Sequence, residues 1–326
     1  MRTATLTKVV SSAFAFMLVG LVGCEGEYDG TAPNDAPVVF LTPSAWSAWS
    51  DPVPVEELNT TANDGNANLS NDGLTLYLNS NRSGGLGGND IYVSRRASTD
   101  DPWGTPESLG SVVNSSSDDQ GPSISKDGLL LFFLSTRPGG LGAADLYVSR
   151  RTDPTDETGW GTPENLGSDV NTSGIENAPH FQKKGEDGNP SLYFARAATN
   201  DIYVAPMTKD GATLGPAVAL DVLNSSALDG GPCVSKDGLE LIFNSNRAGG
   251  FGAFDLYVST RADVHDAWSP PQHLGAPPNS TVSTVGDFSP ALSSDGRTLM
   301  FTRADGSGNF DIWMSTRTVI GNGGGD

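Results

Sequence analysis

Residues 122–128 read Pro-Ser-Ile-Ser-Lys-Asp-Gly, residues 133–137 read Phe-Leu-Ser-Thr-Arg, and residues 145–148 read Asp-Leu-Tyr-Val. The last motif recurs as an Asp-Ile/Leu-Tyr/Trp-Val/Met tetrad that opens at Asp90, Asp145, Asp201, Asp255 and Asp311. The five copies are 54 to 56 residues apart, and each is rich in short apolar runs and glycine turns. A repeat of this length and composition predicts a ring or array of small β-sheets.

Each repeat has four parts in a constant order. It opens with Trp-x-x-Pro, of which the fourth copy keeps only Pro216, and continues with Asn, two hydroxyl residues and an acid. An apolar run then ends in Asp-Gly, a strong hairpin signal, and an Arg with a glycine-rich turn leads into the tetrad. In residues 74–78, Leu-Thr-Leu-Tyr-Leu, the leucines share one face, as in a strand beside a core. Each repeat therefore supplies about four short strands, the content of one propeller blade.

These motifs together resemble the TolB-like β-propeller repeat, which is also described as WD-like. The resemblance spans residues ~49–317 and rests on five copies in phase rather than on any single copy. It implies an all-β fold with a single propeller. The third copy departs most, because Phe-Gln-Lys-Lys at 181–184 replaces the usual approach to Asp-Gly, and Ala-Arg-Ala at 195–197 lacks the Gly-Gly turn. We expect that blade to be irregular.

The chain begins and ends in the middle of a blade. Its first repeat element, Trp49, belongs to an outer strand, and no Trp-x-x-Pro follows the last tetrad at Asp311. We therefore predict five blades of four antiparallel strands, closed by pairing residues ~49–58 with residues 311–317, because closure removes an exposed sheet edge. The alternative is a six-bladed ring in which residues 36–48 add a degenerate blade, although these residues are too few for four strands.

The N-terminus has the features of a bacterial lipoprotein signal. Arg2 and Lys8 supply a positive region, and residues 9–20 form an apolar stretch too short to span a membrane comfortably. Residues 21–24, Leu-Val-Gly-Cys, resemble the lipobox, which implies cleavage before Cys24 and a diacylglycerol on its sulfur. The alternative is an ordinary signal peptide with an incidental cysteine.

The segments of the chain follow from these boundaries. A lipidated Cys24 anchors a protein to a membrane without spanning it. Glu25 rather than Asp follows it, which by resemblance to enteric lipoproteins favours the outer membrane, facing the periplasm or the cell surface. We expect a lipoprotein signal peptide over residues 1–23, a flexible tether over 24–45, a propeller over 46–318 and a disordered tail over 319–326.

The composition limits the partners. The formal net charge is −20, and removal of Arg2 and Lys8 with the signal peptide makes it −22. Such a surface repels nucleic acid and anionic lipid headgroups. If Cys24 is lipidated, Cys233 has no partner, so a disulfide framework is excluded and Cys233 is expected in the core. We expect a monomer that binds an envelope protein, peptide or glycan.

The second part of each repeat places polar side chains between an outer strand and the next inner strand. In a propeller this connection crosses one rim and enters the central channel. The sequence predicts a ring of candidate ligands at the channel rim: Asn59, Asn114, Asn171, Asn224 and Asn279 with Asp64, Asp119, Glu176, Asp229 and Asp287. Such oxygens suit Ca²⁺, and clustered carboxylates also suit a Lys or Arg of a partner. The alternative, that each acid accepts hydrogen bonds at its own turn, is favoured by its occurrence in every blade.

An arginine precedes each tetrad, eight residues before the Asp in four copies and five residues before it in the third. Because both residues flank one hairpin, we predict structural ion pairs between them. These pairs are Arg82–Asp90, Arg137–Asp145, Arg247–Asp255 and Arg303–Asp311. A ligand role for arginines that recur in every blade is less favoured.

No catalytic residue is predicted. The three histidines, His180, His265 and His273, lack metal-binding spacing, and neither Gly-x-Ser-x-Gly nor His-Glu-x-x-His is present. The sequence favours a lipid-anchored, non-enzymatic binding scaffold of the cell envelope, with Ca²⁺ at the acidic ring as the only candidate cofactor. The alternatives are a glycan-cleaving propeller that uses two or three channel carboxylates, and a structural spacer. Specific chemistry is expected where the copies differ, in blade three and around Cys233 and His180.

Overall fold

The computed structural model describes residues 45–183, 185, 188–304 and 308–320. The expected signal peptide, the lipidation site Cys24 and nearly all of the expected tether lie outside the described residues, as do residues 321–326. Within the described part of the chain, no helix is long and apolar enough to cross a membrane.

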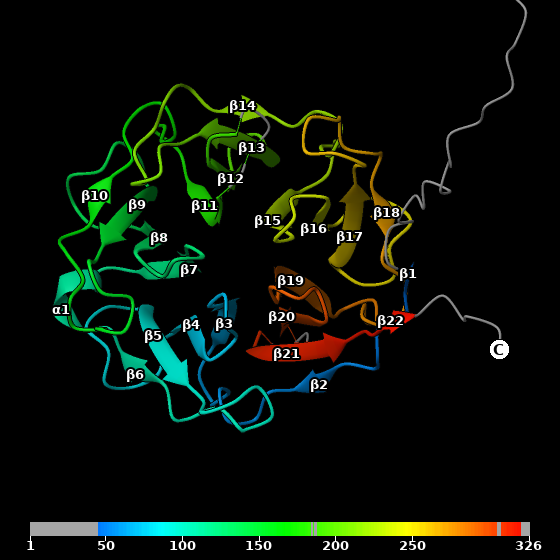
Figure 1. The fold of residues 1–326 in the computed structure, drawn as a ribbon, viewed down its shortest axis with the longest axis horizontal. Coiled ribbons are helices and arrows are strands. Elements are labelled where there is room, and N and C mark those ends of the chain that lie inside the picture. The colour runs from blue at the N-terminus through cyan, green and yellow to red at the C-terminus, as the bar shows by residue number, and fades with distance from the viewer. Residues whose placement is uncertain (1–44, 184, 186–187, 305–307, 321–326) are drawn as a thin grey trace, which may run out of the picture. The chain divides into compact units, whose positions relative to one another are not determined.

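In the described residues, five four-stranded antiparallel sheets form the blades of a propeller, which Figure 1 shows around a common centre. Blade 1 contains β3 (Asp64–Leu69), β4 (Thr75–Ser80), β5 (Asp90–Arg95) and β6 (Glu107–Ser108). Blade 2, after the four-residue helix α1 (Gly110–Val113), contains β7 (Asp119–Ile124), β8 (Leu130–Ser135), β9 (Asp145–Arg150) and β10 (Glu164–Asn165). Blade 3 contains β11 (Glu176–Gln182), β12 (Ser191–Arg196), β13 (Asp201–Pro206) and β14 (Val218–Ala219). Blade 4 contains β15 (Asp229–Val234), β16 (Glu240–Ser245), β17 (Asp255–Thr260) and β18 (Gln272–His273).

Blade 5 closes the ring and is built from both parts of the chain. Its strands β19 (Gly286–Leu292), β20 (Thr298–Ala304) and β21 (Phe310–Thr316) come late in the sequence, and its outer strand β2 (Val53–Pro54) comes early. Val53 pairs with Met314, and Figure 1 shows β2 in blue beside β21 in red. The predictions of five blades and of closure by the N-terminal strand are confirmed.

A second short pair lies next to this closure. β1 (Ala45–Trp46) pairs with β22 (Val319–Ile320). These two short strands include Ala45, which we expected in the tether, and Val319 and Ile320, which we expected in the tail. Residues 45 and 46 add a strand pair and not a sixth four-stranded blade.

The core consists of layers between neighbouring blades, because both faces of each second strand are buried. In β4, Leu76 and Leu78 pack with Met300 of blade 5, whereas Tyr77 between them packs with Phe133 of blade 2. Successive side chains of a strand point to opposite faces, so one strand serves two layers. The apolar runs of the repeat therefore act as the contacts that join each blade to the next.

Blade 3 keeps four strands and differs from the other blades in its hairpin. Its β12–β13 turn spans residues 197–200, which is four residues. The equivalent turns of blades 1, 2 and 4 span nine residues each: 81–89, 136–144 and 246–254. The irregularity expected for this blade is thus a shortened turn at the end of the channel where the innermost strands begin.

Candidate binding site at the channel mouth

The acids of the repeat lie at the start of the innermost strands and are buried. Asp119 opens β7 and has no exposed surface. It accepts hydrogen bonds from the N–H of Ser115 at 2.6 Å, from the Ser115 hydroxyl at 2.9 Å and from Nη2 of Arg137 at 2.7 Å. Equivalent acid–arginine pairs are Asp64–Arg82, Glu176–Arg196, Asp229–Arg247 and Asp287–Arg303.

The predicted pairing of each arginine with the tetrad aspartate is therefore wrong. Ser80 of β4 pairs with Asp64 on one side and with Asp90 on the other, so both carboxylates are near Arg82. Asp90 accepts the N–H of Leu86 in its own glycine turn at 2.8 Å, and Arg82 turns to Asp64 instead, at 2.6 Å. Asp145 and Asp255 likewise accept N–H groups of their own turns, and Asp311 accepts a hydrogen bond from the side chain of Asn309. The arginines of these repeats pair instead with the repeat acids: Arg137 with Asp119, Arg247 with Asp229 and Arg303 with Asp287.

Each repeated asparagine caps the third strand of the preceding blade. The Asn114 side chain accepts from the N–H of Ile91 at 2.8 Å and donates to the Ile91 carbonyl at 2.9 Å. Asn59, Asn171, Asn224 and Asn279 make the same pair of bonds with Ile312, Leu146, Ile202 and Leu256. The carboxamide thus extends each sheet by one hydrogen-bonded position.

These contacts agree with the alternative in which each acid of the ring serves its own turn. The carboxylates face five separate arginines, so they do not share a position for one cation. Among the described residues, no group of three or more His, Cys, Asp or Glu side chains is placed to hold a metal ion. The residues of the predicted ring therefore lie at one end of the blades, but their contacts stabilise the turns and strands of the propeller.

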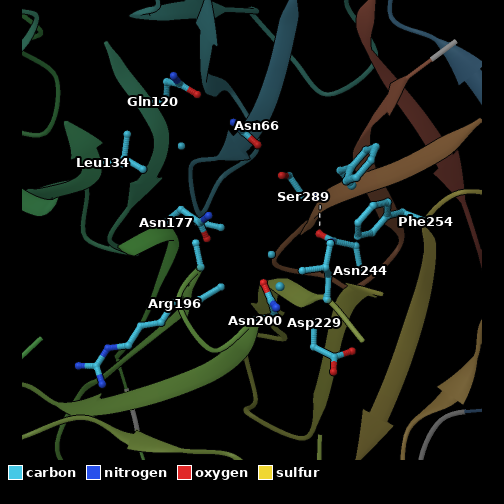
Figure 2. Close-up of a pocket in the computed structure, with 18 residues that line it drawn as sticks. Asn66, Gln120, Leu134, Asn177, Arg196, Asn200, Asp229, Asn244, Phe254 and Ser289 are labelled. Carbon is cyan, nitrogen blue, oxygen red and sulfur yellow. Dashed lines mark hydrogen bonds between the residues drawn. The ribbon is translucent and has the colours of Figure 1, made fainter. Parts of the chain in front are cut away.

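A cavity of about 380 Å³ opens at this end of the channel and is lined by residues of all five blades. Figure 2 shows Gln120, Asn177 and Asn200 around it. The charged groups of Arg196 and Asp229 point away from these amides, because Arg196 lies beside Glu176 and Asp229 pairs with an arginine of its own blade. Among the described residues, the two charged side chains that line this cavity are thus already paired.

Aromatic side chains lie on the side of the mouth formed by blades 4 and 5. The Phe254 and Phe288 rings, both half-buried, have centroids 4.6 Å apart, and Phe310 lies 6.1 Å from Phe288. A second cavity of about 330 Å³ contacts Phe288 and Phe310 and shares Asn66 and Gln120 with the first. Amides beside partly exposed aromatic rings are typical of sites for uncharged polar ligands.

The innermost strands bulge below the mouth and narrow the channel. Two residues after each acid the backbone is left-handed, with φ between 47° and 61° at Asn66, Gly121, Ala178, Gly231 and Ser289. The strand registers slip at these residues, as in a β-bulge. The space that they line is only about 30 Å³, so the channel is narrow between the mouth and the opposite end.

The opposite end of the channel contains basic and buried side chains. Lys126, Lys236, His180 and Cys233 line a space of about 40 Å³ there. Burial, with the nearby Lys126, lowers the pKa of His180 to about 4, and burial raises the pKa of the Cys233 thiol to about 12. At neutral pH the imidazole is neutral and the thiol is protonated, so Cys233 is not activated as a nucleophile. Cys233 is buried, as expected.

Among the residues that line the mouth, Asp64 and Asp229 belong to the predicted ring, whereas the amides Gln120, Asn177 and Asn200 were not predicted individually. Gln120 and Asn177 directly follow a repeat acid, at a position whose residue type changes from copy to copy. The signal that could have found them is the difference between copies, since the shortened turn of blade 3 borders the cavity through Ala197 and Asn200.

The chain matches no protein-family model and no curated protein. Among solved structures it is similar to an alpha-L-arabinofuranosidase from Podospora anserina, at 12% identity over 85% of this chain and 98% of that one, with a TM-score of 0.56. An alpha-L-arabinofuranosidase from Lactobacillus brevis is similar at 13% identity over 83% and 95% of the two chains, with a TM-score of 0.55. At these identities the likeness shows the propeller fold alone.

TolB from Acinetobacter baumannii is also similar, at 15% identity over 81% of this chain and 57% of that one. Its TM-score is 0.46. The choice between a binding and a catalytic function rests on the residues of the mouth.

Proposed function

We propose that this chain is a non-enzymatic binding propeller of the cell envelope, which takes a protein, peptide or glycan ligand at the mouth of its central channel. The observation that carries the proposal is the character of the mouth: two adjoining cavities of about 380 and 330 Å³, lined by amides and phenylalanines. Pockets with mostly apolar walls and a few polar groups bind small ligands or ligand side groups.

The carboxylates at the mouth do not suit hydrolysis. Glycoside hydrolysis by the common route needs two carboxyl groups that are free to protonate and to attack or activate water. Among the described residues, Asp64 and Asp229 are the acids that line the two cavities; each is at most 3% exposed and is held by an arginine at 2.6 Å. Neither carboxylate is therefore free of an arginine partner, as the common route would need.

One acid does differ from the others. Burial raises the pKa of Asp287 above its ordinary value, which is the asymmetry expected of a catalytic acid. However, Asp287 has no exposed surface, pairs with Arg303 at 2.7 Å and lines neither cavity. Its raised pKa therefore supports a buried structural role better than a catalytic one.

The experiment compares binding with turnover on one panel of envelope and plant polysaccharides and envelope peptides. We expect at least one member to bind without being cleaved, and the double variant Asn177→Ala/Asn200→Ala to bind it at least about tenfold more weakly. Lys236→Ala, at the opposite end of the channel, is the matched control and is expected to bind like the wild type. The glycosidase alternative is tested because arabinofuranosidases share the propeller fold. Release of a product by the wild type, but not by Asp229→Asn, would establish it.

The proposal includes attachment to the outer membrane through Cys24. The lipobox-like residues 21–24 support it, because acyl chains would hold the propeller at the envelope without a spanning helix. Metabolic labelling with a radioactive fatty acid is expected to mark the wild-type protein and not Cys24→Ser. Equal labelling of both proteins, or of neither, would remove the anchor from the proposal.

A further inference from the structure

The bulge residue of each innermost strand has a backbone N–H that lies outside the strand ladder. In blade 2, for example, the register passes from Gln120 to Ser123 and skips Gly121. The N–H of Gly121 instead donates across the blade interface to Oδ1 of Asn79 in β4, at 3.1 Å. The bulge therefore needs an acceptor from the second strand of the preceding blade.

Two further blade interfaces supply that acceptor in the same way. The N–H of Ser289 donates to Oδ1 of Asn244 at 3.1 Å, and the N–H of Asn66 donates to Oγ1 of Thr302 at 2.8 Å. In each case the acceptor is the residue that pairs with the residue after the repeat acid. Two of these three acceptors are asparagine carboxamides, which are substituted acetamides.

The remaining two interfaces have apolar residues at the acceptor position. Leu134 stands opposite Gln120 in blade 2, and Ala195 stands opposite Asn177 in blade 3. The N–H groups that they would satisfy belong to Ala178 and Gly231, which the registers of β11 and β15 skip. Among the residues that the structure describes, no side chain accepts a hydrogen bond from either N–H group.

These two donors belong to residues that line the mouth. Leu134, Ala178, Ala195 and Gly231 all contact the cavity of about 380 Å³. On this side of the mouth two side-chain acceptors are replaced by apolar residues, and the turn of blade 3 has only four residues. A backbone N–H that no described side chain satisfies favours a ligand that brings an acceptor oxygen.

We propose that this part of the mouth binds the acetamido group of an N-acetylated sugar. The acetamido carbonyl accepts from the N–H of Ala178 or Gly231, as the Asn79 carboxamide accepts from Gly121, and its methyl group contacts Leu134 and Ala195. The ligand thus supplies the group that asparagine supplies at the other interfaces. This inference deepens the proposed function and rests on it.

The rest of the cavity favours a saccharide over a peptide. The side-chain amides of Gln120, Asn177 and Asn200 are half-buried and make no hydrogen bond to another described residue, and Figure 2 shows them around the opening. A carboxamide both donates and accepts, which matches sugar hydroxyl groups. The cavity offers no unpaired charge for a peptide terminus or an acidic side chain, because Arg196 and Asp229 are already paired.

The first test uses two disaccharides that differ at the acetamido group. Di-N-acetylchitobiose and cellobiose share one skeleton, and cellobiose has a hydroxyl where the former has an acetamido group. In calorimetric titrations of the full chain, we expect cellobiose to bind at least about tenfold more weakly, because a site built to hydrogen-bond a group rejects the analogue without it. Equal affinity for the two sugars would overturn the inference. N-acetylalanine amide, which carries the acetamide without sugar hydroxyls, is expected to bind weakly. If it binds as tightly as di-N-acetylchitobiose, the ligand is a peptide and the inference of a saccharide is wrong.

The second test fills the site from within. Leu134→Asn and Ala195→Asn, singly and together, place a carboxamide at the positions that Asn79 and Asn244 hold. We expect the double variant to remain folded and to bind di-N-acetylchitobiose at least about tenfold more weakly, since its new side chains accept from Ala178 and Gly231. The control is Leu214→Asn, an exposed residue of blade 3 that does not line the cavity.

A double variant that folds and binds chitobiose like the wild type would contradict the inference. The proposed function fails separately. If another member of the glycan and peptide panel binds at the mouth and is lost in Asn177→Ala/Asn200→Ala, binding stands and only the acetamido assignment is wrong. If nothing binds at the mouth, both are wrong.

Discussion

Asp119→Ala is expected to lower the free energy of unfolding by about 3–5 kcal/mol, the range found when one partner of a buried ion pair is removed. The side chain of Asp119 has no exposed surface, and that of Arg137, 2.7 Å away, is 16% exposed. The substitution leaves the guanidinium with the Val113 carbonyl as its remaining backbone acceptor and removes the acceptor of the Ser115 N–H. Equilibrium urea unfolding, followed by tryptophan fluorescence, measures the change.

The matched control is Glu164→Ala. Glu164 and Arg150 form an ion pair of nearly the same length, 2.8 Å, but their side chains are 70% and 30% exposed. Exposed pairs contribute about 0–1 kcal/mol, because water screens the attraction and both side chains lose freedom. Equal losses in the two variants would show that burial does not decide the strength of the repeat pair.

Leu58→Ala is expected to destabilise the closed ring by about 2–5 kcal/mol, as is usual for a large-to-small change in a core. Leu58 follows the closing strand β2, is fully buried and packs between blades 5 and 1 with Leu76, Met300 and Ile312. Loss of its side chain leaves a cavity at the one interface that joins the two parts of the chain. Thermal and urea unfolding measure the effect.

Val53→Ala tests whether the loss comes from the core. Val53 lies in β2 itself and pairs with Met314, but it is 48% exposed. An exposed site of this kind is expected to change stability by about 0.5 kcal/mol or less. A Val53→Ala effect as large as that of Leu58→Ala would mean that the loss does not depend on burial in the core.

The period and the phase of the repeat were enough to predict the fold. Five tetrads indicated five blades, and the outer-strand element at Trp49 with no counterpart after Asp311 indicated that β2 completes blade 5. Both inferences rest on local sequence patterns: the repeated motifs and the alternation of side chains along a strand. What they could not show is which hydrogen-bonding group meets which across a hairpin.

The arginine of the repeat shows that difficulty. Sequence spacing places Arg82 near both Asp64 and Asp90, because Ser80 pairs with both of them in the sheet. The choice follows the glycine turn, in which the N–H of Leu86 donates to Oδ2 of Asp90. Such competition between acceptors is decided by turn geometry, which spacing alone does not contain.

The candidate site was hidden for a related reason. A repeat draws attention to what recurs, and the residues that recur here are held in scaffold contacts. The mouth depends instead on two departures, Leu134 and Ala195, at a position where other copies have Asn79, Asn244 and Thr302. Only the three-dimensional register identifies that position as the acceptor for a neighbouring blade.

The closure of blade 5 also sets the order in which the ring can assemble. The first three strands of each blade are joined by short hairpins, whereas Asn59 bonds to Ile312 across 253 positions of the chain. Contacts between distant residues form late, because the chain loses loop entropy before the contact stabilises it. Until β2 docks, β21 is an unpaired edge open to a strand of another molecule. We therefore expect the protein to be most exposed to aggregation before this closure forms.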